Sequence, residues 1–430
     1  MRTRLVLAVT AAALVAAACG GSASSTAPAS QAAGASGAAG SARPTGTLTI
    51  ADWEFSENDG RSAALKGYMQ ANPGAKLEFQ TMSYNTYVPT IKTQIGAGGG
   101  PDVMVLLDST FADLQKAGSL EPITSVTPDQ EAQLRAENAL AVVNGQRYGM
   151  IWETVIYGML YNKDLLSKAG ITEAPKDFAT FLADCQAIKA KTGKWGFAAR
   201  NMLSETESWY EDFTGTWIAG YGGSWSDASG KFTIDNPANI QAVSDFATVY
   251  KSGCMDTGVP ASVFRPSYKN GDVAILMDNA DAGFTYTDKN TILTDQLQGS
   301  GPLPMPTPQS GRQELFLSIL KNSKNIALAQ DFMNWLLEPA SQTALVAATA
   351  PQTTATTVTP TAEFTAAHPW ATHWYDQPKN GVSLLLNGRP ELTPQLAQTV
   401  MPFVAQVLAG QLTAADAMKQ AQAAAVQAMP

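Results

Sequence analysis

Residues Gly149–Leu166 read GMIWETVIYGMLYNKDLL and place an acidic side chain, Glu153, at the head of an apolar run. The part from Val155 to Tyr161 is rich in β-branched and aromatic residues, which predicts a buried β-strand. A carboxylate rarely enters such a setting unless a partner holds it, because burying an unpaired charge is costly. The stretch therefore predicts a buried strand and raises the question of what Glu153, which follows Trp152, contacts.

Upstream of this stretch, strand patterns alternate with segments of helical spacing. Strands are predicted in GTLTIADW (46–53), AKLEFQTM (75–82) and PDVMVLLDS (101–109). Helices are predicted in RSAALKGYMQANPGA (61–75) and SYNTYVPTIKTQIGAGGG (83–100). This alternation indicates an α/β protein with a mostly parallel sheet.

Downstream, two long amphipathic helices are predicted in APKDFATFLADCQAIKAKTG (174–193) and NPANIQAVSDFATVYKSG (236–253). A strand is predicted in KNGDVAILMDNA (269–280), and the chain ends in helical segments. The folded body starts near Leu48 and spans roughly 380 residues, which exceeds one comfortable hydrophobic core. We therefore expect two lobes.

The N-terminus indicates export. Arg2 and Arg4 precede the apolar run 5–18, which is too short to span a membrane and is typical of a signal peptide. Residues 1–18 are therefore predicted as the signal and the Gly-, Ser- and Ala-rich segment 19–45 as a flexible tether. Cleavage by ordinary signal peptidase after the small residues and lipidation of Cys19 are both open.

The net charge of the chain restricts its binding partners. The chain has 28 basic and 37 acidic residues, a net charge of −9. Its acidity argues against nucleic acid and anionic membrane surfaces as partners.

Three cysteines are present, and lipidation of Cys19 would leave the pair Cys185 and Cys254. In an exported domain this pair predicts a disulfide, with two buried free thiols as the alternative.

Taken in order, these segments resemble the extracellular solute-binding proteins of ABC importers, in the carbohydrate-binding group that includes maltose-binding proteins. The resemblance is carried by YVPTIKTQIGAGGGPDVMVL, ETVIYGMLYNKDLLSKAGI, KFTIDNPANIQAVSDFATVYKSG, SYKNGDVAILMDNA and VLAGQLTAADAMKQA. The ordered set covers almost the whole mature chain. It implies two α/β lobes joined by crossing segments, with a ligand bound between them.

The resemblance also implies an organisation of the chain. The first lobe is expected to comprise 46–152 and 301–338, and the second 153–300 and 339–430. We expect a lipid-anchored monomer on the outer face of the cell membrane that delivers a carbohydrate to the permease subunits of an importer. The lipid would be its sole link to the membrane, and neither a cofactor nor a metal is expected.

Candidate ligand-binding residues lie where predicted strands end or aromatic residues gather. Glu153 matches the position of a sugar-binding Glu in maltose-binding relatives, and the indole of Trp152 suits the apolar face of a sugar ring. The full set comprises Trp53, Glu54, Tyr84, Asp108, Trp152, Glu153, Trp209, Tyr210, Asp278 and Asn279.

Other functions remain open at this stage. A secreted carbohydrate-active hydrolase would use paired carboxylates such as Glu153 and Asp108, but no catalytic motif supports it. A polyol or a glycerophosphodiester could replace the di- or oligosaccharide as ligand. An anionic ligand would require an arginine in the cleft, for which Arg200 and Arg265 are the candidates.

Overall fold

The computed structural model describes residues 43–53, 60–284, 292–348 and 354–430. Arg43–Pro430 forms one compact unit. The predicted signal, Cys19 and almost all of the predicted tether lie outside the described residues. Among the residues that are described, no helix combines the length and the apolar character needed to cross a bilayer.

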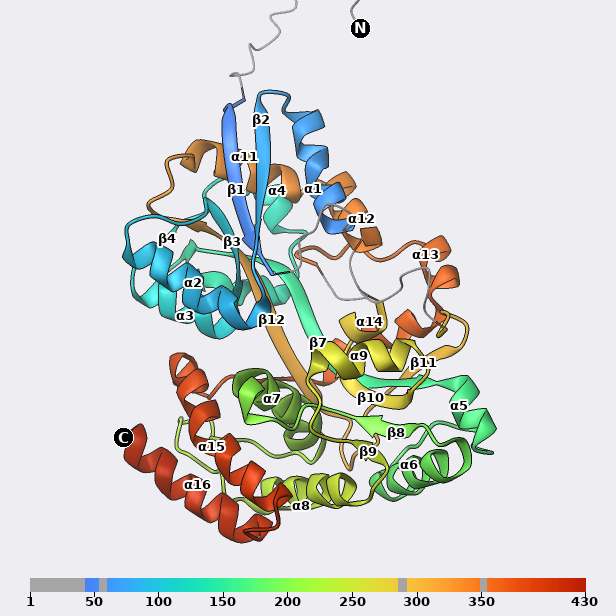
Figure 1. Cartoon of the computed structure of the whole chain (residues 1–430). Coiled ribbons are helices and arrows are strands. Elements are labelled where there is room, and N and C mark those ends of the chain that lie inside the picture. Colours follow the sequence, from blue (N-terminus) through green and yellow to red (C-terminus); the bar gives the residue numbers. More distant parts are fainter. Residues whose placement is uncertain (1–42, 54–59, 285–291, 349–353) are drawn as a thin grey trace, which may run out of the picture. The chain divides into compact units, whose positions relative to one another are not determined.

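The first lobe is built on a sheet with the strand order β2-β1-β3-β12-β7 (Figure 1). Strands β1, β2 and β3 run parallel, whereas β12 is antiparallel to both β3 and β7. The strands are β1 (Gly46–Asp52), β2 (Ala75–Thr81), β3 (Val103–Leu107), β4 (Leu120–Glu121), β7 (Met150–Asn162) and β12 (Ser310–Leu320). The helices are α1 (Gly60–Ala71), α2 (Tyr84–Gly96), α3 (Asp108–Lys116), α4 (Pro128–Glu131), α11 (Ile326–Leu336) and α12 (Pro339–Ala348).

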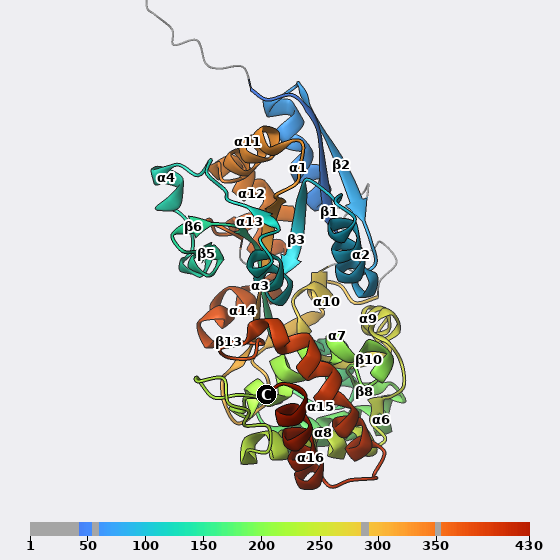
Figure 2. The same ribbon diagram turned by 90° about the vertical axis from the view of Figure 1, so that its left-hand side faces the viewer.

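The second lobe continues the same sheet in the order β7-β10-β8-β9. Its further strands are β8 (Trp195–Ala198), β9 (Met255–Asp256), β10 (Val273–Asn279) and β11 (Gln298–Gly301). Its helices are α5 (Lys163–Lys168), α6 (Phe178–Thr192), α7 (Thr206–Phe213), α8 (Pro237–Lys251), α9 (Ala261–Lys269), α10 (Asp281–Phe284), α15 (Thr393–Leu408) and α16 (Ala414–Ala428). Helices α8, α15 and α16 pack together on one side of this lobe (Figure 2).

Local signals in the sequence explain where these helices begin and end. Asp177 caps α6 in a reciprocal capping box with Thr180, and Gly193 ends the helix in the left-handed conformation. Asn236 caps α8 ahead of a proline at the first helical position. The hydroxyl of Thr413 accepts a hydrogen bond from the Asp416 N–H at the start of α16.

Two strands connect the lobes. Strand β7 places Met150 and Val155 in the first hydrophobic core and Met159 in the second. Strand β12 pairs with β7 along most of its length, and it also pairs with the short strand β13 (Gly381–Ser383) of the C-terminal segment. The predicted α/β fold with two lobes and crossing segments is confirmed.

The C-terminal part divides between the lobes. Helix α12 packs against α1, and its Leu345 belongs to the first core, although the prediction assigned 339–430 to the second lobe. Helices α13 (Ala362–Ala367) and α14 (Thr372–Asp376) follow before α15 and α16 complete the second core. The packing of α12 therefore differs from the predicted boundary, because an amphipathic pattern does not indicate which lobe a helix covers.

A disulfide reinforces the second lobe. Cys185 and Cys254 form a disulfide, with their Cα atoms 5.6 Å apart, that ties α6 to the chain entering β9.

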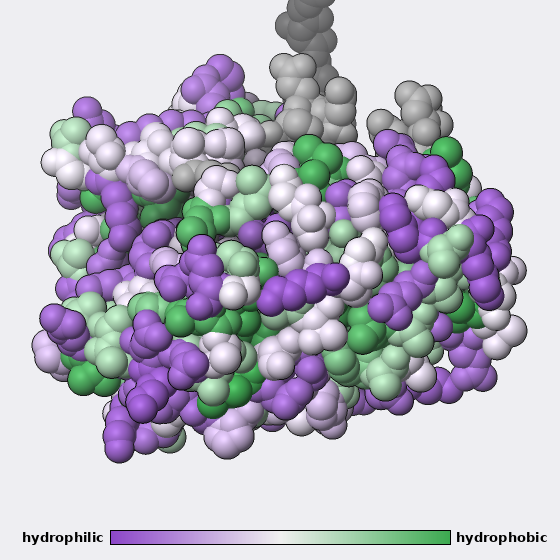
Figure 3. Space-filling view, turned by 60° about the horizontal axis from the view of Figure 1, so that its bottom comes forward, coloured by the Kyte–Doolittle hydropathy of each residue, from purple (hydrophilic) through white to green (hydrophobic). Residues whose placement is uncertain are grey.

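Polar and apolar side chains are interspersed on the face of the molecule shown in Figure 3. This mixture is typical of a surface in contact with water.

Candidate functional site

A cavity of about 390 Å³ lies between the lobes. The first lobe and the crossing strands contribute Trp53, Tyr84, Leu107, Glu153, Val155, Gln313 and Leu315, together with Tyr157. The second lobe contributes Arg200, Glu205, Ser208, Glu211, Asp212, Ala261, Ser262, Arg265, Asn279 and Asp281. The volume is within the usual range for small-molecule sites.

The ends of strands explain why these side chains meet. Trp53 directly follows β1, Leu107 ends β3 and Asn279 ends β10. In α/β sheets, ligands bind beyond the carboxyl ends of the strands, because the loops there converge and leave a crevice. The cavity lies where both lobes present such ends.

The partner of Glu153 is an arginine from a distant helix. Arg61 of α1 donates from Nη1 to Glu153 Oε2 at 3.2 Å, and its Nη2 lies 3.5 Å from Asp281 Oδ1. Arg61 and Glu153 are both buried. Because Asp281 lies in α10 of the second lobe, this one guanidinium links the first lobe, a crossing strand and the second lobe.

Two further arginines are paired with carboxylates on the second-lobe side. Arg200 donates to Asp212, which also accepts a hydrogen bond from the Tyr157 hydroxyl at 3.2 Å. Arg265 holds Asp278 in a bidentate pair with distances of 2.8 and 2.6 Å. Such two-point pairs fix the planes of both groups, so this wall of the cavity is preorganised.

Glu211 forms a direct contact between the lobes. Its Oε2 accepts a hydrogen bond from the Tyr84 hydroxyl at 2.8 Å, and its Oε1 accepts one from Gln313 Nε2 at 3.3 Å. Burial raises the pKa of Glu211 to about 7, and the neighbouring charge of Asp212 adds to the rise. Burial likewise raises the pKa of Asp212 to about 6 and that of Asp108 to about 8.

Aromatic rings form part of the first-lobe wall. The Trp53 indole packs edge-on against Tyr84, with ring centroids 5.3 Å apart, and against Tyr87 at 5.1 Å. Trp53 and Tyr84 are partly buried and line the cavity, whereas Tyr87 is buried beneath them. Edge-on packing fixes the orientation of the Trp53 ring beside the carboxylates.

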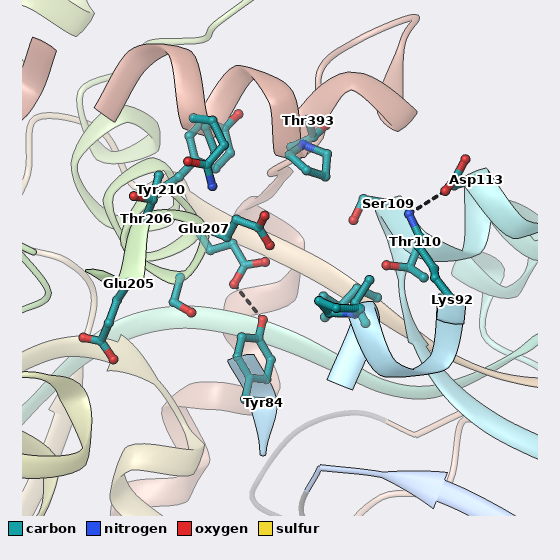
Figure 4. A pocket seen from close by; sticks show the side chains of 18 of the residues that line it. Tyr84, Lys92, Ser109, Thr110, Asp113, Glu205, Thr206, Glu207, Tyr210 and Thr393 are labelled. Atoms are coloured by element: carbon teal, nitrogen blue, oxygen red, sulfur yellow. Dashed lines mark hydrogen bonds and ion pairs between the residues drawn. The ribbon is translucent and has the colours of Figure 1, made fainter. Parts of the chain in front are cut away.

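A second cavity of about 440 Å³ shares part of its lining with the first, and Figure 4 shows side chains that line it. Its walls come from α2 and α3 of the first lobe and from α7 and the start of α15 in the second. Tyr84 and Glu211 line both cavities. Their hydrogen bond therefore lies where the two cavities meet.

The structure brings some of the predicted binding residues together and not others. Trp53, Tyr84, Glu153 and Asn279 line the first cavity, and Tyr210 lines the second. Four others are buried and line neither cavity, namely Asp108, Trp152, Trp209 and Asp278. Glu54 lies outside the described residues.

The buried four have identifiable roles. Trp152 belongs to the first core and Trp209 to the second, and Asp278 holds Arg265. Asp108 accepts a hydrogen bond from the Ser109 N–H at the start of α3, between two residues that line the cavities. Direct ligand contact by any of these four stays a prediction.

Sequence reasoning missed Glu211, Asp212 and Gln313 as lining residues. The two acids lie in the aromatic segment SWYEDF (208–213), in which the sequence predicts Trp209 and Tyr210 as the ligand-binding residues. Helical spacing gave the available signal, because Glu211 is two positions from Trp209 and so faces away from that core residue. Arg200 and Arg265, predicted only as candidates for an anionic ligand, both line the first cavity.

Two lobes, two crossing strands and a polar cavity between them define the class of two-lobed binding proteins. The family described as bacterial extracellular solute-binding protein matches residues 56–343, and the chain belongs to this family. The family resemblance read from the sequence is thereby confirmed.

Individual relatives agree with this assignment. The diacetylchitobiose binding protein DasA of Streptomyces coelicolor is 25% identical over 301 residues, which cover 68% of this chain and 69% of that protein. The structure of maltose-bound T. maritima MalE3 superposes with a TM-score of 0.78 at 21% identity, covering 89% of this chain and 100% of the other. The GacH receptor of Streptomyces glaucescens superposes with a TM-score of 0.76 at 20% identity, covering 90% and 98%.

Proposed function

We propose that this protein captures a carbohydrate, preferably a di- or oligosaccharide, between its two lobes and delivers it to the permease of an ABC importer. The observation that carries the proposal is the 390 Å³ cavity, which both lobes line with paired charges beside an indole ring. Carboxylates and guanidinium groups supply acceptors and donors for several hydroxyls at once. The Trp53 ring supplies an apolar surface for the C–H face of a sugar.

The ligands of relatives support the same class of solute. The relative from Streptomyces coelicolor is named for diacetylchitobiose, and the T. maritima structure contains maltose. The receptor from Streptomyces glaucescens has been solved with acarbose. All three are saccharides or close analogues, and the cavity of this chain has the hydrogen-bonding groups that such ligands require.

Capture would proceed by closure of the lobes. A ligand shifts the equilibrium from the open to the closed form only by the difference between its affinities for these two forms. Contacts with both lobes at once are made in the closed form, so these contacts produce that difference. Trp53 on one side and Asn279 on the other both line the cavity. A ligand in contact with both would hold the lobes together.

Anchoring and location belong to the same proposal. The family implies export. Lipidation of Cys19 would hold a monomer at the outer face of the cell membrane, and the segment 19–45 would let the folded unit reach its permease. Ordinary signal peptidase cleavage would instead release it, and the mass of the mature N-terminal peptide distinguishes the two.

The two other candidate functions have less support. Asp212 and Asp278 already engage Arg200 and Arg265, which leaves less positive charge for an anionic ligand such as a glycerophosphodiester. For hydrolysis, Glu153 is paired with Arg61, and Asp108 does not line the cavity. The named relatives are binding proteins.

Thermal unfolding of residues 43–430 against a panel of sugars, polyols and a glycerophosphodiester tests the proposal. A ligand at a hundred times its Kd adds about 2.7 kcal/mol of stability. We expect a saccharide to raise Tm by a few degrees. A shift with only a polyol or a phosphodiester would overturn the ligand class, and hydrolysis products on chromatography would indicate an enzyme.

Two tryptophan variants locate the site. Trp53→Ala should abolish the ligand-induced shift, measured against the variant's own unliganded Tm. Trp195→Ala is the matched control, because Trp195 is also partly buried but lies at the start of β8 and lines neither cavity. Equal loss in both variants would contradict binding in this cleft.

A further inference from the structure

A lysine is buried in the second lobe, outside both cavities between the lobes. Lys269 ends α9, is 1% exposed and lines neither cavity. A buried ammonium group is costly unless its protons are bonded to acceptors. Its Nζ donates to the Gly283 carbonyl at 2.6 Å and to Gln298 Oε1 at 3.0 Å. Since Gly283 belongs to α10 and Gln298 begins β11, the ammonium group joins three elements of this lobe.

Gly283 is tightly enclosed on this side of α10. Gln298 Nε2 also donates to the Gly283 carbonyl, at 3.3 Å, so one oxygen accepts from two side chains. A Cβ atom on Gly283 would lie 2.8 Å from both the Gln298 amide and the Trp370 ring. The indole N–H of Trp370 in turn donates to Asp295 at 2.6 Å. These neighbours leave α10 little room to shift.

The other end of α10 lies at the cavity between the lobes. Asp281 is the first residue of α10 and lines the 390 Å³ cavity. Its Oδ1 lies 3.5 Å from Arg61 Nη2 of the first lobe. Asp281 and Gly283 are two positions apart in a helix of four residues. Because consecutive Cα atoms keep a fixed spacing, a displacement of Gly283 also moves Asp281.

We propose that Lys269 is a positioning residue for ligand capture: its ammonium group, bound to the Gly283 carbonyl, fixes α10 so that Asp281 meets Arg61 when the lobes close. This inference rests on the proposed closure of the lobes around a ligand. Lys269 acts from behind the cleft, in the way that supporting hydrogen bonds hold the groups of a binding site in place. Its loss loosens a contact between the lobes and removes no group from the cavity.

A lysine in this place makes the support dependent on pH. Burial lowers the pKa of Lys269 from 10.5 to about 8, and the neighbouring carboxylate of Asp295 opposes this shift. Asp295 also contacts His368 Nδ1 at 3.0 Å, and Arg265, one turn earlier on α9, is paired with Asp278. A neutral amine donates a weaker hydrogen bond than an ammonium ion. Affinity for the ligand should therefore fall as pH rises through about 8.

Hydrogen exchange in the ligand-free protein tests the support itself, on residues 43–430, the compact unit that contains both cores. Lys269→Met keeps most of the apolar stem and removes the ammonium group, so the amides of α10 should exchange at least about tenfold faster. Lys163→Met is the matched control, because Lys163 also donates to a main-chain carbonyl, that of Gln296, but is exposed. Unchanged exchange in Lys269→Met would overturn the inference, whichever ligand the protein binds.

Calorimetric titration with maltose and with diacetylchitobiose tests the effect on capture. For whichever sugar binds, Lys269→Met should raise Kd by about tenfold, and Lys163→Met should leave it unchanged. An unchanged Kd in Lys269→Met would overturn the inference and leave the proposed function standing. Binding of neither sugar would count against the proposed function, and the exchange measurement would then decide the inference alone.

A glycine variant moves α10 without removing a charge. Gly283→Ala places a methyl group against Gln298 and the Trp370 ring, so α10 must shift although Lys269 is still present. Kd should rise by about tenfold, as in Lys269→Met. Gly96→Ala is the control, because its Cβ would meet nothing within 4 Å, and its Kd should equal that of the wild type. A wild-type Kd in Gly283→Ala would show that the position of α10 does not control affinity.

The pH dependence of Kd separates positioning by a charge from general support of the fold. The wild type should lose affinity as pH rises through about 8, and Lys269→Met should lack this loss. Gln298→Glu places a carboxylate against the ammonium group and raises its pKa, so the loss of affinity should move to higher pH. The same pH profile in all three proteins would refute the role of the lysine charge.

Discussion

Arg61 and Glu153 are separated by 92 residues in the chain, yet they form a buried ion pair at 3.2 Å beside the cavity between the lobes. The same guanidinium approaches Asp281, so one cation lies between two carboxylates. Burying charges is favourable only when they compensate one another. This pairing accounts for the acidic residue at the head of an apolar strand.

Arg61→Met should destabilise the protein strongly, because it leaves two carboxylates in a buried setting without that cation. We expect a loss of about 3–5 kcal/mol in the free energy of unfolding, measured by urea denaturation. Lys76→Met is the control, since it removes the exposed pair with Glu78 and should cost less than about 1 kcal/mol. Similar losses in both variants would contradict the role of burial.

Stability without ligand should fall as pH rises through the neutral range. The pKa of Glu211 is raised by burial from 4.5 to about 7, so the folded protein retains a proton that the unfolded chain releases. Stability is therefore highest below pH 4.5 for this group, falls as pH rises and reaches its lower plateau above about pH 7. Asp212, with a pKa raised to about 6, acts in the same direction.

Calorimetric scans between pH 5 and 8 check this expectation. Glu211 faces Tyr84, Gln313, Asp212 and Arg200, and Glu211→Gln should flatten the decrease in Tm by about a few degrees. Glu207→Gln, an exposed position on the same helix, should keep the slope of the wild type. An unchanged slope in Glu211→Gln would assign the dependence to other groups.

The disulfide should contribute substantially to stability. Cys185 and Cys254 are 69 residues apart, and closing a loop of this size restricts the unfolded chain by about 2–4 kcal/mol. The double variant Cys185→Ser/Cys254→Ser should lose about this amount in chemical denaturation. A reducing agent should lower the Tm of the wild type and leave the Tm of the double variant unchanged. An equal decrease in both proteins would show that the disulfide is not the source of the effect.

A glycine in the crossing strand should tolerate no side chain. A Cβ atom on Gly158 would lie 2.7 Å from the ring of Trp374, which is fully buried. Gly158→Ala should therefore cost about 1–3 kcal/mol of stability. Gly96→Ala is the control, because its Cβ would meet nothing within 4 Å. If both substitutions are neutral, Trp374 must be free to move.

Local sequence patterns predicted the helices and strands well, because secondary structure depends largely on residues that are close in the sequence. Period-two and period-3.6 spacing identified β1, β3, α6 and α8. Order along the chain was enough to identify the family.

The partners within the site could not be predicted, because they are far apart in sequence. Tyr84 and Glu211 are 127 residues apart, and Arg61 precedes Glu153 by 92. Hydrophobic spacing also failed to separate cleft aromatics from core aromatics. Trp152 is buried while Trp53 lines the cavity, and only the packing of the two lobes decides between these outcomes.

The interleaving of the two cores bears on how the chain leaves the cell. The first core draws on residues from Leu48 to Leu384 and the second on residues from Met159 to Met429. Neither lobe can complete its interior until nearly the whole polypeptide has been synthesised, and contacts so distant in sequence form slowly. We therefore expect an exported chain with this architecture to complete its two cores late, which leaves time for export in the unfolded state.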